Sequence, residues 1–182
     1  MENILNYSKI DGVFEIRIQK FKDNRGSFSN IFRANEKVFS SSWNRPIKQI
    51  NLSLTKQKGT IRGLHLQKKP YLEAKLIRCI RGVVFDIAVD LRKNSSTYLS
   101  WHAVELDSEK NNGIIIPEGC AHGFQTLTSN CELLYIHSND WVSSSEIGIR
   151  YNDSAIGVTW PIKCTELSDR DRNLPFLESI DL

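Results

Sequence analysis

What the sequence lacks narrows the classes of protein to which it can belong. It has no apolar run approaching the roughly 20 residues that cross a bilayer. The start Met1-Glu2-Asn3 has neither the basic nor the apolar segment of a signal peptide. Lysine and arginine number 24 against 21 aspartates and glutamates, which is too balanced for the basic face of a nucleic-acid-binding protein. We therefore expect a protein without a membrane or nucleic-acid partner.

Motifs of several enzyme classes are also missing. Neither a glycine-rich phosphate loop nor a Gly-x-Ser-x-Gly nucleophile motif is present. The four cysteines form no Cys-x-x-Cys pair, so a zinc site built from thiolates is not expected. We expect four reduced thiols in a cytoplasmic protein, with Cys79 and Cys131 as small core residues.

What the sequence does contain is a series of short alternating segments rich in β-branched and aromatic residues. This pattern predicts strands separated by turns. The strands are expected over residues 13–19, 48–54, 60–67, 75–81, 83–91, 99–106, 113–116, 124–127, 132–137 and 147–151. Helical signal is limited to about one turn near 35–39 and a short helix after Ser168, which is expected to cap it. Many short strands in 182 residues predict one all-β domain, a sandwich or barrel.

The expected strand 83–91 carries acidic residues on an otherwise apolar face. Asp86 and Asp90 share that face with Val84 and Ala88. In a jelly roll, a polar side chain on an inward face can line a pocket between the sheets. Alternation alone leaves both a pocket and a solvent-facing position open for these aspartates.

His65 stands in the most informative setting among the four histidines. Arg62 precedes it and Lys75 follows it, so its surroundings are cationic. A histidine can take a proton from carbon, an arginine can hold an anionic substrate and a lysine can hold the charge that develops. Strict pleating would place Arg62 and His65 on opposite faces, so both reach one pocket only if the strand bends at Gly63. A strand histidine is more often structural, and alone this segment supports only an anion-binding pocket.

The other histidines carry weaker signals. His122 follows a Pro-Glu-Gly turn and is expected at the mouth of the barrel, although a structural role in the turn is the simpler interpretation. His102 is expected at the surface or in the core, and His137, at a strand end, has no assigned role. Tyr135 lies in the middle of a strand and is a weak acid suited to face a histidine base.

Several long segments of the sequence resemble those of a known protein family. They read, in chain order, GTIRGLHLQ, EAKLIRCIRGVVFDIAVDLRKNSSTY, IIIPEGCAHGFQTL, ELLYIHS and RYNDSAIGVTWP. Together they resemble the dTDP-4-dehydrorhamnose 3,5-epimerase family, from about Arg25 to Asp171. The resemblance implies one cupin-type jelly roll (a double-stranded β-helix) over residues 1–182, with short peripheral helices. It also implies that segment 161–182 contributes Asp171 to the site and that the protein is a homodimer.

The same resemblance implies an isomerase that acts on a nucleotide sugar. The expected reaction inverts C3, C5 or both in a nucleoside-diphospho-4-keto-6-deoxysugar, in the biosynthesis of rhamnose-like sugars for surface polysaccharide such as O-antigen. No metal and no organic cofactor are expected.

The resemblance assigns roles residue by residue. The expected catalytic set is the base His65, its partner Asp171, the acid Tyr135, the enolate-supporting Lys75 and the second histidine His122. Asp169 remains an alternative partner of the base. The expected substrate-binding set is Arg25, Asn30, Gln49, Asn51, Arg62, Trp141, Glu146 and Arg170. Asn30, the pair Asp140-Trp141 and Ile136 depart from the usual family residues, and these departures concern the nucleotide and the sugar rather than the chemistry.

The sequence is also compatible with three other interpretations. The first is a related enzyme on nucleotide sugars, either a single-centre epimerase or a 3,4-ketoisomerase. The second is a non-catalytic sugar-binding jelly roll, which would not need an acid that faces a base. The third is a metal-dependent cupin, and the missing His-x-His pair at His65 argues against it.

Overall fold

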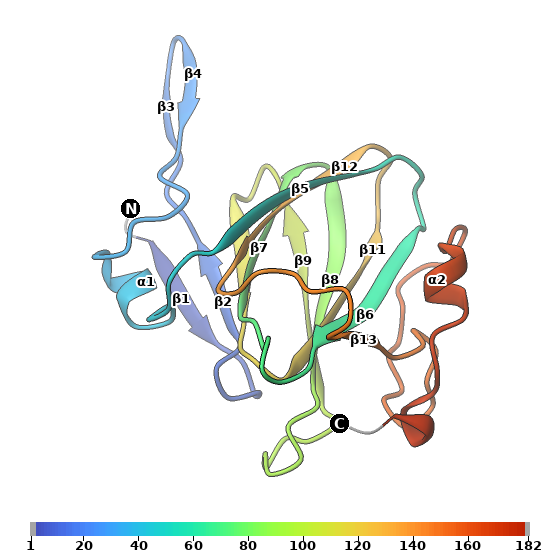
Figure 1. Ribbon diagram of the computed structural model, residues 1–182. Coiled ribbons are helices and arrows are strands. Elements are labelled where there is room, and N and C mark those ends of the chain that lie inside the picture. The colour runs from blue at the N-terminus through green and yellow to red at the C-terminus, as the bar shows by residue number, and fades with distance from the viewer. Residues whose placement is uncertain (1–2, 181–182) are drawn as a thin grey trace.

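The alternating segments form two antiparallel sheets that face each other (Figure 1). The structure is a computed structural model that describes residues 3–180. The six-stranded sheet has the order β1 (Ile4–Tyr7), β2 (Phe14–Arg17), β10 (Asn112–Ile116), β7 (Lys75–Arg81), β12 (Cys131–His137) and β5 (Gln49–Thr55). The five-stranded sheet has the order β13 (Glu146–Gly148), β6 (Ile61–Gln67), β11 (Cys120–Thr126), β8 (Val83–Asp90) and β9 (Trp101–Asp107). The predicted all-β jelly roll is confirmed.

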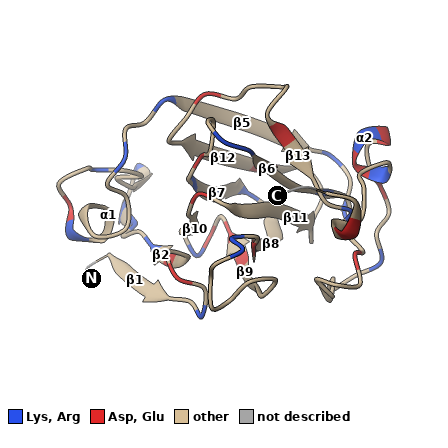
Figure 2. Cartoon of the chain, turned by 60° about the horizontal axis from the view of Figure 1, so that its bottom comes forward, with Lys and Arg blue, Asp and Glu red and all other residues tan. Residues whose placement is uncertain are grey.

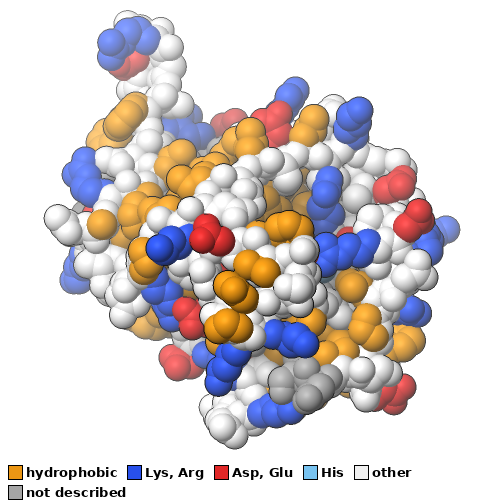
Figure 3. Space-filling view, in the orientation of Figure 1, with side chains coloured by type: hydrophobic (Ala, Val, Ile, Leu, Met, Phe, Trp, Pro, Cys, Tyr) orange, Lys and Arg blue, Asp and Glu red, His pale blue; other side chains and the backbone are white. Residues whose placement is uncertain are grey.

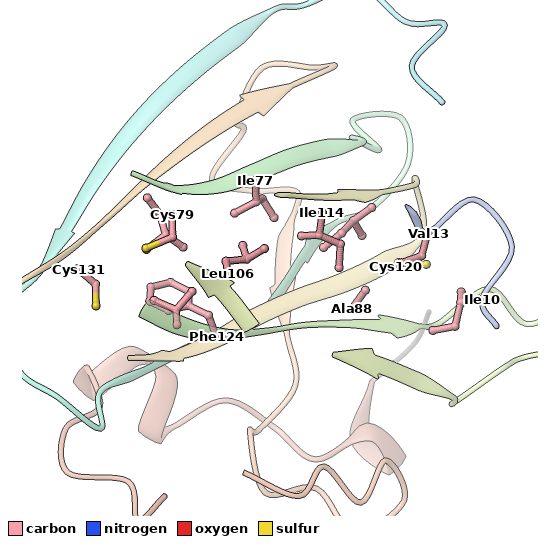
Figure 4. Packing of buried hydrophobic residues seen from close by; sticks show 13 residues of the cluster. Ile10, Val13, Ile77, Cys79, Ala88, Leu106, Ile114, Cys120, Phe124 and Cys131 are labelled. Atoms are coloured by element: carbon pink, nitrogen blue, oxygen red, sulfur yellow. The ribbon is translucent and has the colours of Figure 1, made fainter. Parts of the chain in front are cut away.

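Apolar side chains from both sheets fill one end of the space between them. Figure 4 shows Ile77 and Ile114 of the six-stranded sheet pointing toward Leu106 and Phe124 of the other sheet. Burial of each such side chain stabilises the fold by about 1.5–3 kcal/mol. Cys79, Cys120 and Cys131 are buried and Cys164 is partly buried, and all four are free thiols, as the sequence predicted. Polar residues occupy the other end of this space and form the site described below.

The outer faces of the sheets are covered by short segments. Helix α1 (Lys37–Ser40) packs Phe39 against Leu76 and Ile136 of the six-stranded sheet. The C-terminal segment covers the five-stranded sheet and contains α2 (Asp169–Arg172) and the 3-10 helix η1 (Leu177–Ser179). A parallel bridge between Thr60 and Glu166 ties this segment to the start of β6.

Ser168 caps α2, as the sequence predicted. Its Oγ accepts a hydrogen bond from the backbone N–H of Asp171 at 3.0 Å. Such a cap contributes about 1 kcal/mol, which matters for a helix of 4 residues that would be marginal alone. The cap therefore fixes the backbone that carries Asp171.

A hairpin of β3 (Phe21–Asp23) and β4 (Gly26–Phe28) projects from the body of the molecule (Figures 1 and 3). All of its residues are exposed. The sequence predicted neither these strands nor β1, because segments of three or four residues are too short for alternation to show.

The strand pairing corrects two expectations about histidine and aspartate. The strand expected to begin at residue 124 begins at Cys120, so His122, which was expected between the turn and this strand, lies inside β11 and pairs with β8. Asp86 and Asp90 are fully buried, so the solvent-facing alternative is wrong for both. Asp86 faces the pocket side chains, whereas Asp90 binds Arg92, Ser95 and Thr97 of the following loop. These pairings join distant segments and cannot be read from local alternation.

Candidate active site

A cavity of about 700 Å³ opens between the two sheets at their polar end. The six-stranded sheet contributes to its wall eight residues, namely Gln49, Ile50, Asn51, Leu52, Ser53, Lys75, Tyr135 and His137. The five-stranded sheet contributes Arg62, His65, His122 and Phe124. The C-terminal segment adds Ser168, Arg170 and Asp171, β13 of the five-stranded sheet adds Glu146, and Glu73 and Trp141 complete the lining. Facing sheets thus place titratable groups on opposite sides of one cavity.

His65 and Asp171 form the first pair in this cavity. The His65 Nε2 and Asp171 Oδ1 atoms are 2.6 Å apart. Burial by itself would raise the pKa of Asp171, but the hydrogen bonds from His65 and from the Gly63 backbone N–H outweigh it and hold the pKa below its usual value. An ionised Asp171 accepts the Nε2–H, so Nδ1 of His65 keeps a free lone pair. Asp169, the alternative partner, is exposed and does not make this contact.

Gly63 provides the bend that the sequence required. Its φ of +122° is rarely open to other residues, and a Cβ there would lie 2.7 Å from the Gly123 Cα. The pairing of β6 with β11 skips Leu64 between Gly63 and His65, which is a bulge. Arg62 and His65 consequently both line the cavity, and this expectation is confirmed.

His122 and Asp86 form a second, deeper pair on the same sheet. The His122 Nε2 and Asp86 Oδ2 atoms are 2.9 Å apart, and both side chains are buried. Burial lowers the pKa of His122 and raises the pKa of Asp86, so each group is pushed toward its uncharged form. Asp86 is a site residue that the sequence reasoning left undecided.

Tyr135 faces these histidines from the other sheet. Its ring lies edge-on to the His122 ring, with 6.0 Å between the centroids. Its hydroxyl oxygen lies 3.5 Å from the Ser53 Oγ. Burial raises the pKa of Tyr135, so the phenol keeps its proton at neutral pH and can donate it.

Lys75 binds Glu73, which in turn binds His137, and the sequence predicted no role for either of these two residues. Its Nζ lies 3.1 Å from Glu73 Oε1 and 3.5 Å from the His65 carbonyl oxygen. The other Glu73 oxygen, Oε2, lies 2.7 Å from His137 Nδ1. His137 was given no role, although its spacing of two from Tyr135 on one strand already places both side chains on the same face.

Most of the expected substrate-binding residues form a connected polar rim. The Trp141 backbone N–H donates to Gln49 Oε1 at 2.9 Å, and Gln49 Nε2 donates to Asn51 Oδ1 at 3.0 Å. Glu146 Oε2 accepts from the Trp141 indole at 2.8 Å and from Arg170 at 2.7 Å. Arg170 belongs to α2, where acidic and basic residues stand together (Figure 2).

Arg25 and Asn30 are not brought into the cavity of their own chain. Arg25 lies in the turn of the projecting hairpin, where its side chain is 91% exposed and pairs with Asp23. Asn30 follows the hairpin. Their expected role in substrate binding stays a prediction.

Residues 3–180 contain no group of three or more histidine, cysteine or acidic side chains placed to hold a metal ion. Within the same range, no helix has the length and apolar character needed to span a bilayer. His102 lies outside the cavity and binds Glu15, at 2.8 Å between Nε2 and Oε1.

Comparison with known proteins gives consistent matches over nearly the whole chain. The family model of dTDP-4-dehydrorhamnose 3,5-epimerase matches residues 7–179. The dTDP-4-dehydrorhamnose 3,5-epimerase of Shigella flexneri is 41% identical over 88% of this chain and 87% of its own length. A dTDP-4-dehydrorhamnose 3-epimerase of Streptomyces niveus is 34% identical over 90% of this chain and 79% of its own length.

A solved structure shares the fold as well as the sequence. It is the dTDP-6-deoxy-D-glucose-3,5-epimerase from Legionella pneumophila in complex with dTDP-4-keto-L-rhamnose. It is 32% identical, has a TM-score of 0.92, and the match covers 98% of this chain and 95% of that one.

Proposed function

Because this chain belongs to the dTDP-4-dehydrorhamnose 3,5-epimerase family, we propose that it inverts C3 and C5 of a dTDP-linked 4-keto-6-deoxysugar. The chain is an isomerase of that family, and the proposal concerns its substrate and the roles of its residues. One observation carries the proposal: the His65–Asp171 pair on one side of the cavity faces Tyr135 on the other. A base and an acid on opposite sides of a ring are what inversion of a carbon centre needs.

His65 removes the proton in this proposal. The C4 ketone acidifies the hydrogens on the neighbouring carbons, and the Nδ1 lone pair of His65 takes one of them. The electron pair of the broken C–H bond moves to the ketone oxygen and forms an enolate. Ionised Asp171 stabilises the imidazolium that results, and a positioned base of this kind contributes about 10²–10⁴-fold in rate.

Lys75 and His122 support the enolate oxygen. The Lys75 ammonium supplies a positive charge in a partly buried site, where it is worth more than in water. Lys75 is already held by Glu73 before substrate binds, so little reorganisation is needed when the negative charge forms.

Tyr135 completes the inversion by returning a proton to the opposite face of the ring. The enolate electrons form the new C–H bond, and the phenolate that remains recovers a proton from solvent. The imidazolium of His65 releases its proton to solvent as well, so no net proton is gained or lost. The same cycle at the second carbon gives the doubly inverted sugar.

The polar rim binds the nucleotide in this proposal. Arg62 lines the cavity and can pair with the diphosphate, since guanidinium groups match phosphate oxygens well. The exposed indole of Trp141 offers a flat apolar surface, and Gln49, Asn51, Glu146 and Arg170 offer donors and acceptors at the cavity rim.

We further propose a homodimer in which the hairpin of each chain reaches the partner's cavity. On β5, an edge strand, Ile50, Leu52 and Leu54 are 59%, 62% and 48% exposed, which makes a contiguous apolar stripe. The expected substrate-binding residues Arg25 and Asn30 do not line the cavity of their own chain, and a two-fold partner would give them one.

Two further proposals concern the extent of the domain and the cellular compartment. We propose that residues 1–182 act as one domain, because Asp171 of segment 161–182 enters the cavity and Glu166 pairs with Thr60. We propose the cytoplasm as the compartment, because the four free thiols suit a reducing environment.

Incubation in deuterium oxide tests the proposed reaction. The protein is mixed separately with dTDP-, CDP- and GDP-linked 4-keto-6-deoxyglucose, and products are followed by mass spectrometry and NMR. We expect deuterium at both C3 and C5 of the dTDP-sugar. The similarity to the Streptomyces niveus 3-epimerase favours a second candidate, a single-centre epimerase, which would place deuterium at one carbon only. Absence of exchange with all three sugars would contradict the proposal.

A further inference from the structure

Glu73 and His137 form a buried hydrogen-bonded pair that the proposed proton transfers do not use. Each residue is only 8% exposed. One Glu73 oxygen binds the Lys75 ammonium at 3.1 Å, and the other binds His137 Nδ1 at 2.7 Å. Burial by itself would raise the pKa of Glu73, but the His137 hydrogen bond and the Lys75 charge outweigh it and hold the pKa below its usual value. An ionised carboxylate therefore stands between the lysine and the histidine.

The second ring nitrogen of His137 extends this hydrogen-bond network to Asn51. Its Nε2 lies 3.4 Å from the Asn51 Nδ2. An amide nitrogen only donates, so Nε2 is the acceptor and Nδ1 carries the hydrogen that goes to Glu73. Asn51 Oδ1 in turn accepts from Gln49. Every donor meets an acceptor along the path from Gln49 through Asn51 and His137 to Glu73.

Strand register places this path on rigid elements. His137 on β12 lies directly opposite Lys75 on β7 and opposite Gln49 on β5. The neighbouring row joins Tyr135 with Asn51. Side chains in such rows share one face of the sheet, here the face that lines the cavity. The path therefore crosses the cavity wall from the substrate-binding rim to the lysine.

Lysine needs such a restraint more than other cations. Its ammonium sits on a flexible four-carbon stem, and a displacement of about 1 Å at a reacting centre can cost about 10²-fold in rate. A carboxylate that touched only Lys75 would share its mobility. Here His137 holds the second oxygen of Glu73, so the carboxylate is fixed from both ends.

We propose that Glu73 and His137 are positioning residues, which fix the Lys75 ammonium in the cavity and link it to the substrate-binding Asn51. The inference rests on the proposed function, because it assumes that Lys75 supports the enolate. Substrate bound at Asn51 would then meet a lysine that is already in place.

A first test needs no substrate. Trace acetylation with acetic anhydride, followed by peptide mass spectrometry, measures the reactivity of Lys75 relative to the exposed Lys110. In Glu73→Gln and His137→Gln we expect acetylation of Lys75 to rise by a factor of several, because its partner is lost or released. In His137→Asn we expect little change, because the amide nitrogen of asparagine can replace Nδ1 as donor to Glu73.

The matched control is His102→Gln. His102 also binds a carboxylate, that of Glu15, but outside the cavity. If the role of His137 were purely structural, His137→Asn and His137→Gln would both lower the unfolding temperature. Neither would then change the reactivity of Lys75 in the folded protein. Equal Lys75 reactivity in all variants would overturn the inference.

A second test uses turnover. With the dTDP-sugar we expect Glu73→Gln to lower kcat by about 10- to 100-fold with KM within about twofold, because an interaction of the transition state is lost. His137→Asn should retain more kcat than His137→Gln. In a Lys75→Ala background, Glu73→Gln should cause little further loss, because Glu73 acts through Lys75.

The outcomes separate this inference from the proposed function. Full additivity of the Glu73 and Lys75 substitutions, or an effect on KM alone, overturns the positioning role. If the parent protein exchanges no deuterium into any nucleotide sugar, the proposed function fails, and Lys75 acetylation still decides whether Glu73 and His137 hold the lysine.

Discussion

At the scale of single residues, the direction of proton transfer depends on how His65 is held. Asp171 accepts the hydrogen of one ring nitrogen at 2.6 Å and leaves the other nitrogen free. His65→Gln keeps a polar side chain but removes the base. We expect it to lose deuterium incorporation by at least about 10²–10⁴-fold, measured by mass spectrometry. His102→Gln is the control, and exchange at the parental rate in His65→Gln would show that another group is the base.

Asp171 also links stability to pH. Its pKa is lower in the folded chain than in the unfolded chain, so the ionised carboxylate stabilises the fold above about pH 4 and this stabilisation is lost as the pH falls through the folded-state pKa. Asp171→Asn should be less stable than the parent by about 2 kcal/mol at pH 7, as expected for a hydrogen bond to a charged group. The difference should stay constant to pH 5 and shrink below about pH 4.

Urea unfolding at pH 7, 5 and 3 measures this difference directly. A gap between parent and variant that already closes between pH 7 and pH 5 would assign the linkage to a histidine and not to the Asp171 carboxylate.

At the scale of elements, the bulge of β6 decides whether Arg62 and His65 share a cavity. Gly63→Ala would add a Cβ 2.7 Å from the Gly123 Cα at a φ of +122°. We expect a loss of about 3–5 kcal/mol in the free energy of unfolding, measured by chemical denaturation, together with lower epimerase activity.

Gly26→Ala is the matched control for this glycine. Gly26 has a φ of +133°, but a Cβ there would meet nothing within 4 Å. It should lose only the backbone term of about 1–3 kcal/mol. Equal losses in the two variants would show that the contact with β11 is not the constraint.

Local sequence patterns predicted the positions of several strands and the cap of α2, but they did not predict which strands pair. Ser168 was identified as a helix cap because a serine before charged residues at a helix start is a local signal. The strand that contains His122 was predicted to begin only at residue 124, because its start is defined by pairing with β8, where His122 lies opposite Ala88. Short strands such as β3 and β4 carried too few residues for a period to be detected.

At the scale of the whole molecule, the exposed stripe on β5 is where we propose that a second copy docks. Leu52, at its centre, is 62% exposed. Leu52→Lys should convert the proposed dimer to monomer, because a charge would be buried without a partner. Light scattering after size exclusion measures the mass.

Tyr98→Lys serves as the control for charge on an exposed apolar residue, since Tyr98 lies in the loop after β8. If dimers form, the monomeric variant should also bind dTDP more weakly, since Arg25 and Asn30 would be removed from the cavity. Leu54→Lys tests this point, because Leu54 belongs to the same stripe but, unlike Leu52, does not line the cavity. A monomeric parent, or a Leu52→Lys variant that remains a dimer, would contradict this arrangement.

By itself, the sequence determined the all-β architecture, the bend required at Gly63 and, through the family motifs, the set formed by His65, Tyr135 and Lys75. These depend on alternation, on backbone conformations that only glycine accepts readily and on side-chain types within short segments. Only the tertiary structure decided that Glu73 binds His137, 64 positions away, and that Asp86 binds His122. The physical reason is that sheet register, which brings distant strands side by side, selects the partners of buried polar groups, and no local pattern records that selection.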